Sequence, residues 1–199
     1  MKILQYSLST LVRKAVFVFI RQVRNVRELI RIARFYFLTH CRARHIMGRV
    51  EVNTLCTNMK MGKNASLYAN TVFEVAQLAN LTIGDNFTLS YGAIIACNHS
   101  VQIGNNVMIG EYSSIRDTTH NYKDLSLPYC QQPDLSEAII IGNNVWIGRG
   151  TIVFPGSVIE DGVIVGAHSV VKGRLTANQV YAGSPLKMIK ELGAPASAQ

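Results

Sequence analysis

The chain has 199 residues, of which 48% are hydrophobic and 16% are charged, and its formal net charge is +8. This composition excludes a disordered chain and supplies enough apolar material for one compact domain with an appendage. The charge is uneven, because residues 1–49 contain eleven Lys or Arg and one acidic residue, whereas residues 50–199 contain nine basic and eleven acidic residues, so the high net charge says little about the ligand of the main domain.

Residues 13–37 have the pattern of an amphipathic helix, or of two helices in succession. The basic set, which recurs every three or four residues, is Arg21, Arg24, Arg27, Arg31 and Arg34. The apolar set, on a different face, is Val16, Ile20, Val23, Val26, Ile30, Ala33 and Phe37. Such a helix can lie on an anionic membrane surface, or it can pack its apolar stripe on the main domain or on a neighbouring subunit. Nucleic acid is not an expected partner, because no binding motif accompanies the charge.

No stretch predicts a transmembrane helix, which needs about 20 mostly apolar residues. The apolar run from Ala15 to Ile20 is flanked by Lys14 and Arg21, and no secretory signal with a small-residue cleavage site is visible. The sequence contains four cysteines, Cys41, Cys56, Cys97 and Cys130. None forms a CxxC pair, so they favour a reducing compartment and do not predict a zinc site.

From Ile141 the sequence repeats every six residues, as IGNNVW, IGRGTI, VFPGSV, IEDGVI and VGAHSV. Each copy begins with Ile or Val, and its fifth residue is compact. Earlier copies read IGDNFT and IGNNVM, and a fainter version begins at Met61. A period of six fits neither an α-helix nor a simple alternating strand. It predicts a chain that turns a corner every six residues, so that three short strands form one coil and successive coils stack in parallel.

The stretch IGNNVWIGRGTIVFPGSVIEDGVIVGAHSVVKG, followed by VYAGSPLKMIKE, resembles the hexapeptide-repeat acyltransferases, and most closely their maltose/galactoside and capsular-polysaccharide O-acetyltransferase branch. The resemblance covers about residues 60–192 and implies an all-β fold, a left-handed parallel β-helix, which is an exception to the usual right-handed crossover. It also implies a homotrimer with sites between subunits. We expect a helical arm over 1–49, a β-helix over 50–175 with an active-site loop at 116–139, and a C-terminal strand, short helix and tail over 176–199.

The repeat is interrupted between Ile115 and Ile141, a distance of 26 residues that is not a multiple of six. Polar residues with Pro128 and Pro133 predict an irregular loop, and a loop on a rigid scaffold often carries function. The family resemblance places its catalytic histidine at His120. A neutral imidazole can take a proton from a sugar hydroxyl as that hydroxyl attacks a thioester, because the unperturbed pKa of histidine is about 6.5. The alternative is an ordinary surface-loop histidine.

Asp117 and Asp124 flank this histidine, and either can hold the ring in one orientation, with Glu137 as a weaker candidate. The alternative for Asp117 is that it caps a turn. Trp146, the only tryptophan, matches a position near the thioester in some polysaccharide-modifying relatives, and its alternative is a hydrophobic residue that covers the next coil. The residues expected beside the acceptor are Asn98 and Tyr122.

The resemblance implies acetyl-CoA as the acyl donor, lying along the coils between two subunits. The small residues expected to let the pantetheine arm approach the backbone are Gly148, Gly150, Ala167 and Ser169. The residues expected toward its phosphates are Lys172, Arg174, Gly183, Pro185 and Lys187. Ser184 is expected to cap a helix that begins at Pro185, with Lys187 in its first turn. No metal is expected, because the spacing of His99, His120 and His168 differs from that of the gamma-type carbonic anhydrases, which share this fold.

These expectations define an O-acetyltransferase that moves an acetyl group from acetyl-CoA to a sugar hydroxyl of a cell-surface polysaccharide or its precursor. The basic arm favours the cytoplasmic face of a bacterial membrane. Two alternatives stay open. One is the same donor with an antibiotic, an amino acid or an amino sugar as acceptor, and the other is a catalytically silent β-helix that serves as an assembly subunit.

Overall fold

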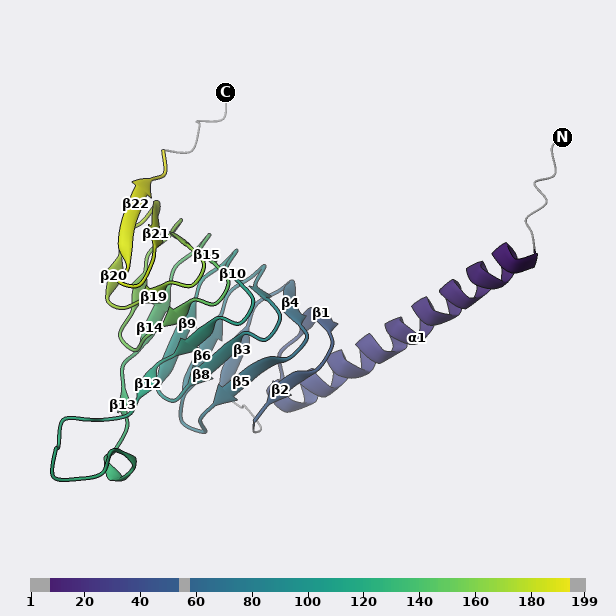
Figure 1. Ribbon diagram of the computed structural model, residues 1–199. Coiled ribbons are helices and arrows are strands. Elements are labelled where there is room, and N and C mark those ends of the chain that lie inside the picture. Colours follow the sequence, from purple (N-terminus) through teal and green to yellow (C-terminus); the bar gives the residue numbers. More distant parts are fainter. Residues whose placement is uncertain (1–7, 54–57, 194–199) are drawn as a thin grey trace.

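The computed structural model describes residues 8–53 and 58–193, and it shows a three-sided stack of short parallel strands with one long helix at its N-terminal end (Figure 1). The predicted all-β parallel β-helix is therefore confirmed. Cys56 and residues 194–199, the last part of the C-terminal region expected over 176–199, lie outside the described residues.

Three sheets form the sides of the stack. Sheet A contains, in spatial order, β1 (Ala43–Met47), β4 (Ala65–Tyr68), β7 (Thr88–Leu89), β10 (Met108–Ile109), β15 (Trp146–Ile147), β18 (Ile164–Val165), β21 (Gln179–Ala182) and β22 (Lys187–Glu191). Sheet B contains β2 (Val50–Val52), β5 (Thr71–Val75), β8 (Ile94–Cys97), β11 (Ser114–Arg116), β16 (Ile152–Val153) and β19 (Val170–Val171). Sheet C contains β3 (Met59–Met61), β6 (Asn80–Ile83), β9 (Ser100–Ile103), β14 (Ile139–Ile141), β17 (Val158–Ile159) and β20 (Arg174–Leu175).

The first residues of the hexapeptides form columns along the inside of the stack. In sheet B, strand pairing places one column in register, Phe73, Ile95, Ile115, Val153 and Val171, and each of these side chains is 0% exposed. Burial of one such side chain contributes about 1.5–3 kcal/mol. The predicted compact positions are buried as well, and Thr151, Ser157 and Ser169 are each 0% exposed. The repeat therefore encodes one continuous apolar core.

Asparagines form several of the corners. Asn86, Asn106 and Asn144 adopt the left-handed conformation, with φ of 57°, 58° and 54°. Asparagine tolerates this region better than most residues because its short side chain bonds locally. The Asn86 side-chain amide donates to Asn106 Oδ1 at 2.8 Å, so equivalent corners of successive coils are also linked to each other. The N in the G-x-N part of the repeat thus has a conformational role.

The predicted arm is one continuous helix, α1 (Leu8–Thr39). Its last turns pack on β1 and β2, where Phe35 is 3% exposed and its ring centroid lies 5.9 Å from that of Phe73. The Thr39 hydroxyl donates to Phe35 O at 2.8 Å, and His40 ends the helix with a φ of 55°. Figure 1 shows the rest of α1 extending away from the stack. No described helix is long and apolar enough to cross a membrane.

The expectation of a short C-terminal helix from Pro185 onward is wrong. Residues Lys187–Glu191 form β22, which pairs antiparallel with β21. The last parallel strand of sheet A is β21, and without a neighbour its outer edge would carry unpaired backbone groups that a returning strand can satisfy. Tertiary pairing here overrides a local Ser-Pro helix-start signal. At the other end, β1 joins sheet A from Ala43, before the expected boundary of the β-helix at residue 50.

Candidate active site

The interrupting loop leaves the stack between sheets B and C. It starts after β11, forms a two-stranded antiparallel base from β12 (Thr118–Thr119) and β13 (Leu135–Ser136), and rejoins the stack at β14. The Thr118 and Ser136 hydroxyl oxygens lie 2.8 Å apart across this base. A short 3-10 helix, η1 (Tyr129–Gln131), lies within the loop. Figure 1 shows the loop projecting well beyond the coils.

His120 stands directly after β12, at the start of the projecting part. Its Nδ1 lies 2.8 Å from Asp134 Oδ1, on the returning side of the loop. A carboxylate is an acceptor, so a neutral ring paired in this way carries its proton on Nδ1 and presents a free electron pair on Nε2. The side chain of His120 is 81% exposed and that of Asp134 is 46% exposed. The loop thus presents a basic nitrogen outward, with its tautomer defined by Asp134.

Asp117 is not the residue that orients His120. It is 0% exposed, and its two carboxylate oxygens accept the backbone N–H groups of Asn98, His99 and Ser100, each at 2.8 Å. The Thr118 hydroxyl adds a contact at 3.1 Å. The expectation that Asp117 belongs to the catalytic group is therefore corrected, since its carboxylate is occupied in fastening the neighbouring turn of the coil below.

The other two acidic candidates also lie elsewhere. Asp124 accepts the hydroxyl and backbone N–H of Ser126 at 2.6 and 2.9 Å, and these bonds lower its pKa below the ordinary value. Glu137 is exposed and joins the loop base to the stack through its backbone, which donates to Asp117 O at 2.9 Å. Asp134 was missed because it lies 14 residues from His120. The sequence offers one indication of this residue: a loop that leaves and rejoins the stack brings its two ends close together, so a partner of His120 can come from the returning end.

The two expected acceptor residues lie near the loop. The backbone of Asn98 is bound to Asp117, and its side chain is exposed at the coil corner below the loop. Tyr122 is 65% exposed, two residues after His120. Both side chains are free to contact a ligand at this corner, and their role stays a prediction.

A groove of about 490 Å³ lies on sheet A, far from the loop in the coil path. Trp146 is 51% exposed and stands in register between Met108 and Ile164. Gly148 and Ala167 also line the groove, and a Cβ added at Gly148 would lie 2.6 Å from the backbone nitrogen of Ala167. The structure thus brings three of the expected donor-site residues together in one apolar groove.

The remaining small residues have structural positions. Gly150 turns a corner with a φ of 66°, and an added Cβ would lie 2.6 Å from Nδ1 of the exposed His168. Ser169 is 0% exposed, and its hydroxyl donates to Gly166 O at 2.7 Å and accepts the Gly183 N–H at 2.9 Å. Neither Gly150 nor Ser169 lines the groove on sheet A, and their contact with the donor stays a prediction.

The expected phosphate-binding residues lie toward the C-terminal end of the stack. Lys172 and Arg174 are exposed, and Arg174 forms an ion pair with Glu160. Lys187 is exposed on β22, next to the turn formed by Gly183 and Pro185. They are spread over two sheets, and their contact with CoA stays a prediction.

Cys97 lies beside Asp117 but cannot act as a nucleophile near neutral pH. Burial, reinforced by the Asp117 charge, raises the pKa of its thiol from 9.0 to about 12. In the described parts of the chain, no three His, Cys, Asp or Glu side chains are grouped so that they could hold a metal ion.

The loop and the groove lie on opposite sides of the three-sided stack. The chain passes from β10 in sheet A to β11 in sheet B, leaves at the corner between sheets B and C, and returns through β14 in sheet C to β15 in sheet A. In a triangular cross-section, the corner between two sides faces the third side. His120 and Trp146 of one chain, although they come from neighbouring coils, therefore lie on opposite sides of the stack.

The regular stack with one histidine-bearing excursion is a parallel β-helix built from hexapeptide repeats. Residues 138–173 match the family model described as bacterial transferase hexapeptide (six repeats). Together with the relatives described next, this match confirms the resemblance to the hexapeptide-repeat acyltransferases and their O-acetyltransferase branch.

Among curated proteins, the chain is 39% identical over 114 residues to a putative lipopolysaccharide biosynthesis O-acetyl transferase, WbbJ, of Escherichia coli, covering 54% of this chain and 58% of that protein. It is 32% identical over 140 residues to galactoside O-acetyltransferase of Escherichia coli, covering 66% and 63%. The chain thus spans less than two thirds of the length of these relatives.

Among solved structures, a maltose O-acetyltransferase from Clostridium difficile has a TM-score of 0.57 at 26% identity, covering 79% of this chain and 72% of that one. A galactoside acetyltransferase in complex with coenzyme A also has a TM-score of 0.57, at 25% identity, covering 79% and 68%.

Proposed function

We propose that the protein is an acetyl-CoA-dependent O-acetyltransferase that acts on a sugar hydroxyl, with His120 as general base. The observation that carries this proposal is the contact between His120 Nδ1 and Asp134 Oδ1, which directs an unprotonated Nε2 out of the loop. The similarity to a galactoside O-acetyltransferase and a lipopolysaccharide biosynthesis O-acetyl transferase supports the donor and the acceptor class. Asn98 and Tyr122 flank the acceptor.

The reaction is a direct transfer within a ternary complex. The acceptor hydroxyl oxygen forms a bond to the thioester carbonyl carbon while its proton passes to His120 Nε2. The carbon–sulfur bond then breaks, and the CoA sulfur leaves and takes the proton from Nε2, so the imidazole returns to its starting state. A backbone N–H near Gly148 stabilises the oxyanion of the intermediate. Asp134 keeps the ring in the productive tautomer.

The donor lies in the groove on sheet A, against Trp146. Gly148 and Ala167 leave its floor without large side chains, which suits the thin pantetheine arm. Lys172, Arg174 and Lys187 lie toward the end where the CoA phosphates are expected. In one chain this groove faces away from His120, so a complete site needs the groove of one subunit and the loop of a neighbour. The proposal therefore includes a homotrimer with three sites between subunits.

The proposal includes binding of the arm to the cytoplasmic face of a bacterial membrane. In the turns that dock on the stack, Phe35 is 3% exposed, whereas Phe37 is 73% and Ile30 is 62% exposed. The packed face and the long apolar stripe are therefore different faces of α1, and the stripe points away from its own β-helix. An apolar stripe beside a row of arginines fits the surface of an anionic bilayer, and each arginine near the lipids adds about 1 kcal/mol.

Sedimentation with vesicles tests the arm. The full chain should sediment with vesicles of phosphatidylglycerol and phosphatidylcholine, and a double substitution, Ile30→Gln with Phe37→Gln, should abolish most of this binding. Leu78→Gln, which changes a residue 89% exposed on the β-helix, is the matched control and should sediment as the unchanged chain does. Unchanged sedimentation of the double variant, together with its dissociation into monomers, would favour a subunit contact in place of the membrane.

The proposed activity is tested by following CoA release from acetyl-CoA with a panel of acceptors. We expect release with saccharides that offer free hydroxyls, and acetyl ester formation detected by mass spectrometry. Turnover with amines alone would favour N-acylation of an amino sugar or another amine. No turnover combined with no binding of CoA would favour a silent assembly subunit and would contradict the proposal.

A further inference from the structure

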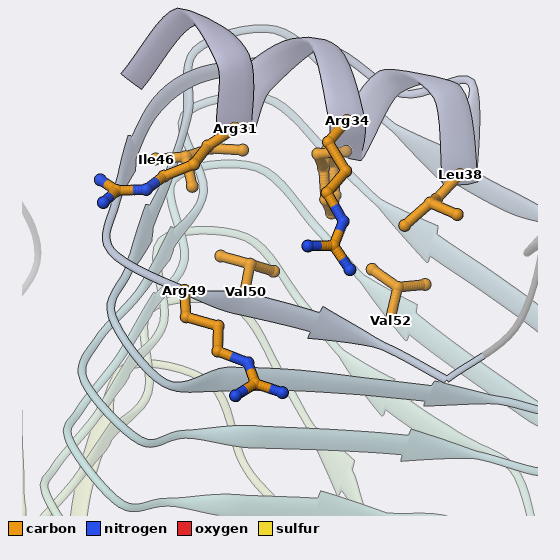
Figure 2. A pocket seen from close by; sticks show the side chains of 8 residues that line it. Arg31, Arg34, Leu38, Ile46, Arg49, Val50 and Val52 are labelled. Carbon is orange, nitrogen blue, oxygen red and sulfur yellow. The ribbon is translucent and has the colours of Figure 1, made fainter. Parts of the chain in front are cut away.

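A cavity of about 190 Å³ lies between the end of α1 and the first coil (Figure 2), and it shares no lining residue with the groove on sheet A. We call it the arginine cavity, and its lining residues are Arg31, Arg34, Phe35, Leu38, Ile46, Arg49, Val50 and Val52. Three of them are permanent cations and five are apolar, and none is acidic. Figure 2 shows Arg34 extending from the helix toward β2, and Arg31 beside Ile46.

The cations of this cavity are poorly neutralised by the protein. Among the described residues, Arg31 and Arg34 form no salt bridge, while the nearby Glu28 contacts His45 at 3.1 Å. Arg49 contacts Glu51 at 2.7 Å, but the two side chains are 75% and 47% exposed, and an exposed pair of this kind is weak and exchangeable. The cavity therefore keeps an excess of positive charge that an anion can neutralise.

The helix brings two of these arginines to the same side of α1. Arg31 and Arg34 are three residues apart, so their side chains leave neighbouring turns on one side of α1. The buried Phe35 and Thr39 anchor this part of the helix on the stack, where Thr39 Oγ1 also accepts the Cys41 N–H at 3.1 Å. Guanidinium groups donate paired hydrogen bonds that match the geometry of phosphate oxygens. A phosphate is thus the anion that this arrangement suits best.

The floor of the cavity adds a second requirement. Ile46 is 1% exposed, and Val50 and Val52 are partly buried beside it, so the surface below the arginines is apolar. A free inorganic anion gains nothing from such a floor, whereas a hydrocarbon attached to the phosphate buries apolar area there. A phosphate that carries an apolar chain therefore matches both the arginines and this apolar floor.

We propose that the arginine cavity binds the phosphate of a lipid phosphate, with the first part of its chain on Ile46, Val50 and Val52. Resting on the proposed function, this makes the acceptor a saccharide linked to such a lipid. Val52, in the cavity, and Ile115, directly before the loop, stand in the same column of sheet B, three strand spacings apart. At about 4.8 Å per spacing the separation is about 14 Å, along the side of the stack from which the loop leaves.

Isothermal titration calorimetry of the full chain tests the cavity without any turnover, so its result is independent of whether acetyl transfer is observed. The probe is octyl phosphate below its micelle concentration, compared with inorganic phosphate and uncharged octyl glucoside. We expect saturable binding of octyl phosphate and at least about tenfold weaker binding of inorganic phosphate, because two buried methylenes already contribute that factor. Octyl glucoside should not bind.

Variants show where the probe binds. Arg31→Gln and Arg34→Gln should each weaken octyl phosphate binding about tenfold, as expected for a lost charged hydrogen bond. Arg27→Gln changes the same charge one helical turn before Arg31, outside the cavity, and should alter the affinity less than about twofold. Val52→Thr should weaken octyl phosphate and leave inorganic phosphate unchanged. Thermal unfolding confirms that each variant is folded.

Three outcomes would overturn the proposal. If octyl phosphate does not bind to the unchanged chain, the arginine cavity is not a binding site for a lipid phosphate. An equal loss in Arg27→Gln and Arg34→Gln shows a diffuse basic field in place of a cavity. Equal affinities for octyl phosphate and inorganic phosphate would identify a site for free anions and would exclude a lipid phosphate as the ligand.

Discussion

The coils and the loop at residues 117–138 are adjacent in the chain but obey different rules. In the coils, every sixth residue enters an apolar column and Ile115 is 0% exposed, so one residue type repeats because one environment repeats. In the loop, His120 and Asp134 are held by a single contact of 2.8 Å and both side chains are substantially exposed. The coils are filled with apolar side chains and form a rigid scaffold. The loop carries the polar side chains that can react, and the coils determine its position.

The largest effect should come from the loop alone. His120→Ala removes the proposed base, and positioned base catalysis contributes roughly 10²- to 10⁴-fold, so turnover should fall at least about a hundredfold. The unfolding temperature and the affinity for CoA should stay close to those of the unchanged chain, because the ring is 81% exposed and buries little apolar surface. Equal losses of CoA binding and turnover would mean that His120 is part of the scaffold.

A second substitution tests the boundary between the two regions. Asp117→Ala leaves the backbone N–H groups of Asn98, His99 and Ser100 without their acceptor, and it should lower the free energy of unfolding by on the order of 3 kcal/mol. Asp124→Ala, in the exposed loop, is the control and should change it by less than about 0.5 kcal/mol. Chemical denaturation measures both. Similar values for the two variants would show that Asp117 is no anchor.

The positioning role of Asp134 predicts a smaller effect. Asp134→Ala should lower kcat about tenfold with little change in KM, because the imidazole loses its fixed tautomer and orientation. Asp134→Asn keeps an oxygen that can accept the Nδ1–H, and it should recover part of the lost kcat. Steady-state kinetics with both substrates distinguishes this from a structural defect, which the conservative variant would not rescue and which would also lower the unfolding temperature.

The last prediction changes the protein least, because it compares the reactivity of one cysteine thiol in the coils with that of one in the loop. The pKa of the Cys97 thiol is raised from 9.0 to about 12, so its thiolate fraction at mildly alkaline pH is about a thousandfold lower than that of an ordinary thiol. Cys130 is exposed in the loop. Iodoacetamide should therefore label Cys130 in the native protein and reach Cys97 only after unfolding, as followed by peptide mass spectrometry. Rapid native labelling of Cys97 would show that the coils open readily.

The strands and core of the repeated coils could be predicted from the sequence. The contacts between residues that do not belong to the repeat could not. Ile or Val every six residues specifies the strands, the corners and the core, because each position meets the same surroundings in every coil. Asp134 could not be identified in this way, since the fold of the loop brings it to His120 from 14 residues away. Asp117 was misassigned for the opposite reason, because nearness in sequence to His120 hid its contacts with the coil below.

The C-terminal strand shows the same limit at the other end. A Ser-Pro pair followed by Leu186 and Lys187 reads locally as a helix start, yet β22 pairs with β21 because the last strand of sheet A offers free backbone groups. Which partner is available depends on the whole stack. A local signal cannot contain that information.

The way in which α1 closes the first coil has a consequence for the size of the molecule. A parallel stack has no intrinsic length, and an uncovered terminal coil would accept the last coil of another copy and grow into a fibre. Phe35 and Leu38 lie over the strands that would receive such a neighbour. The same helix that carries the basic charge therefore also covers the first coil, and β22 covers β21 at the other end of sheet A, so both ends of this sheet are closed to a further parallel coil.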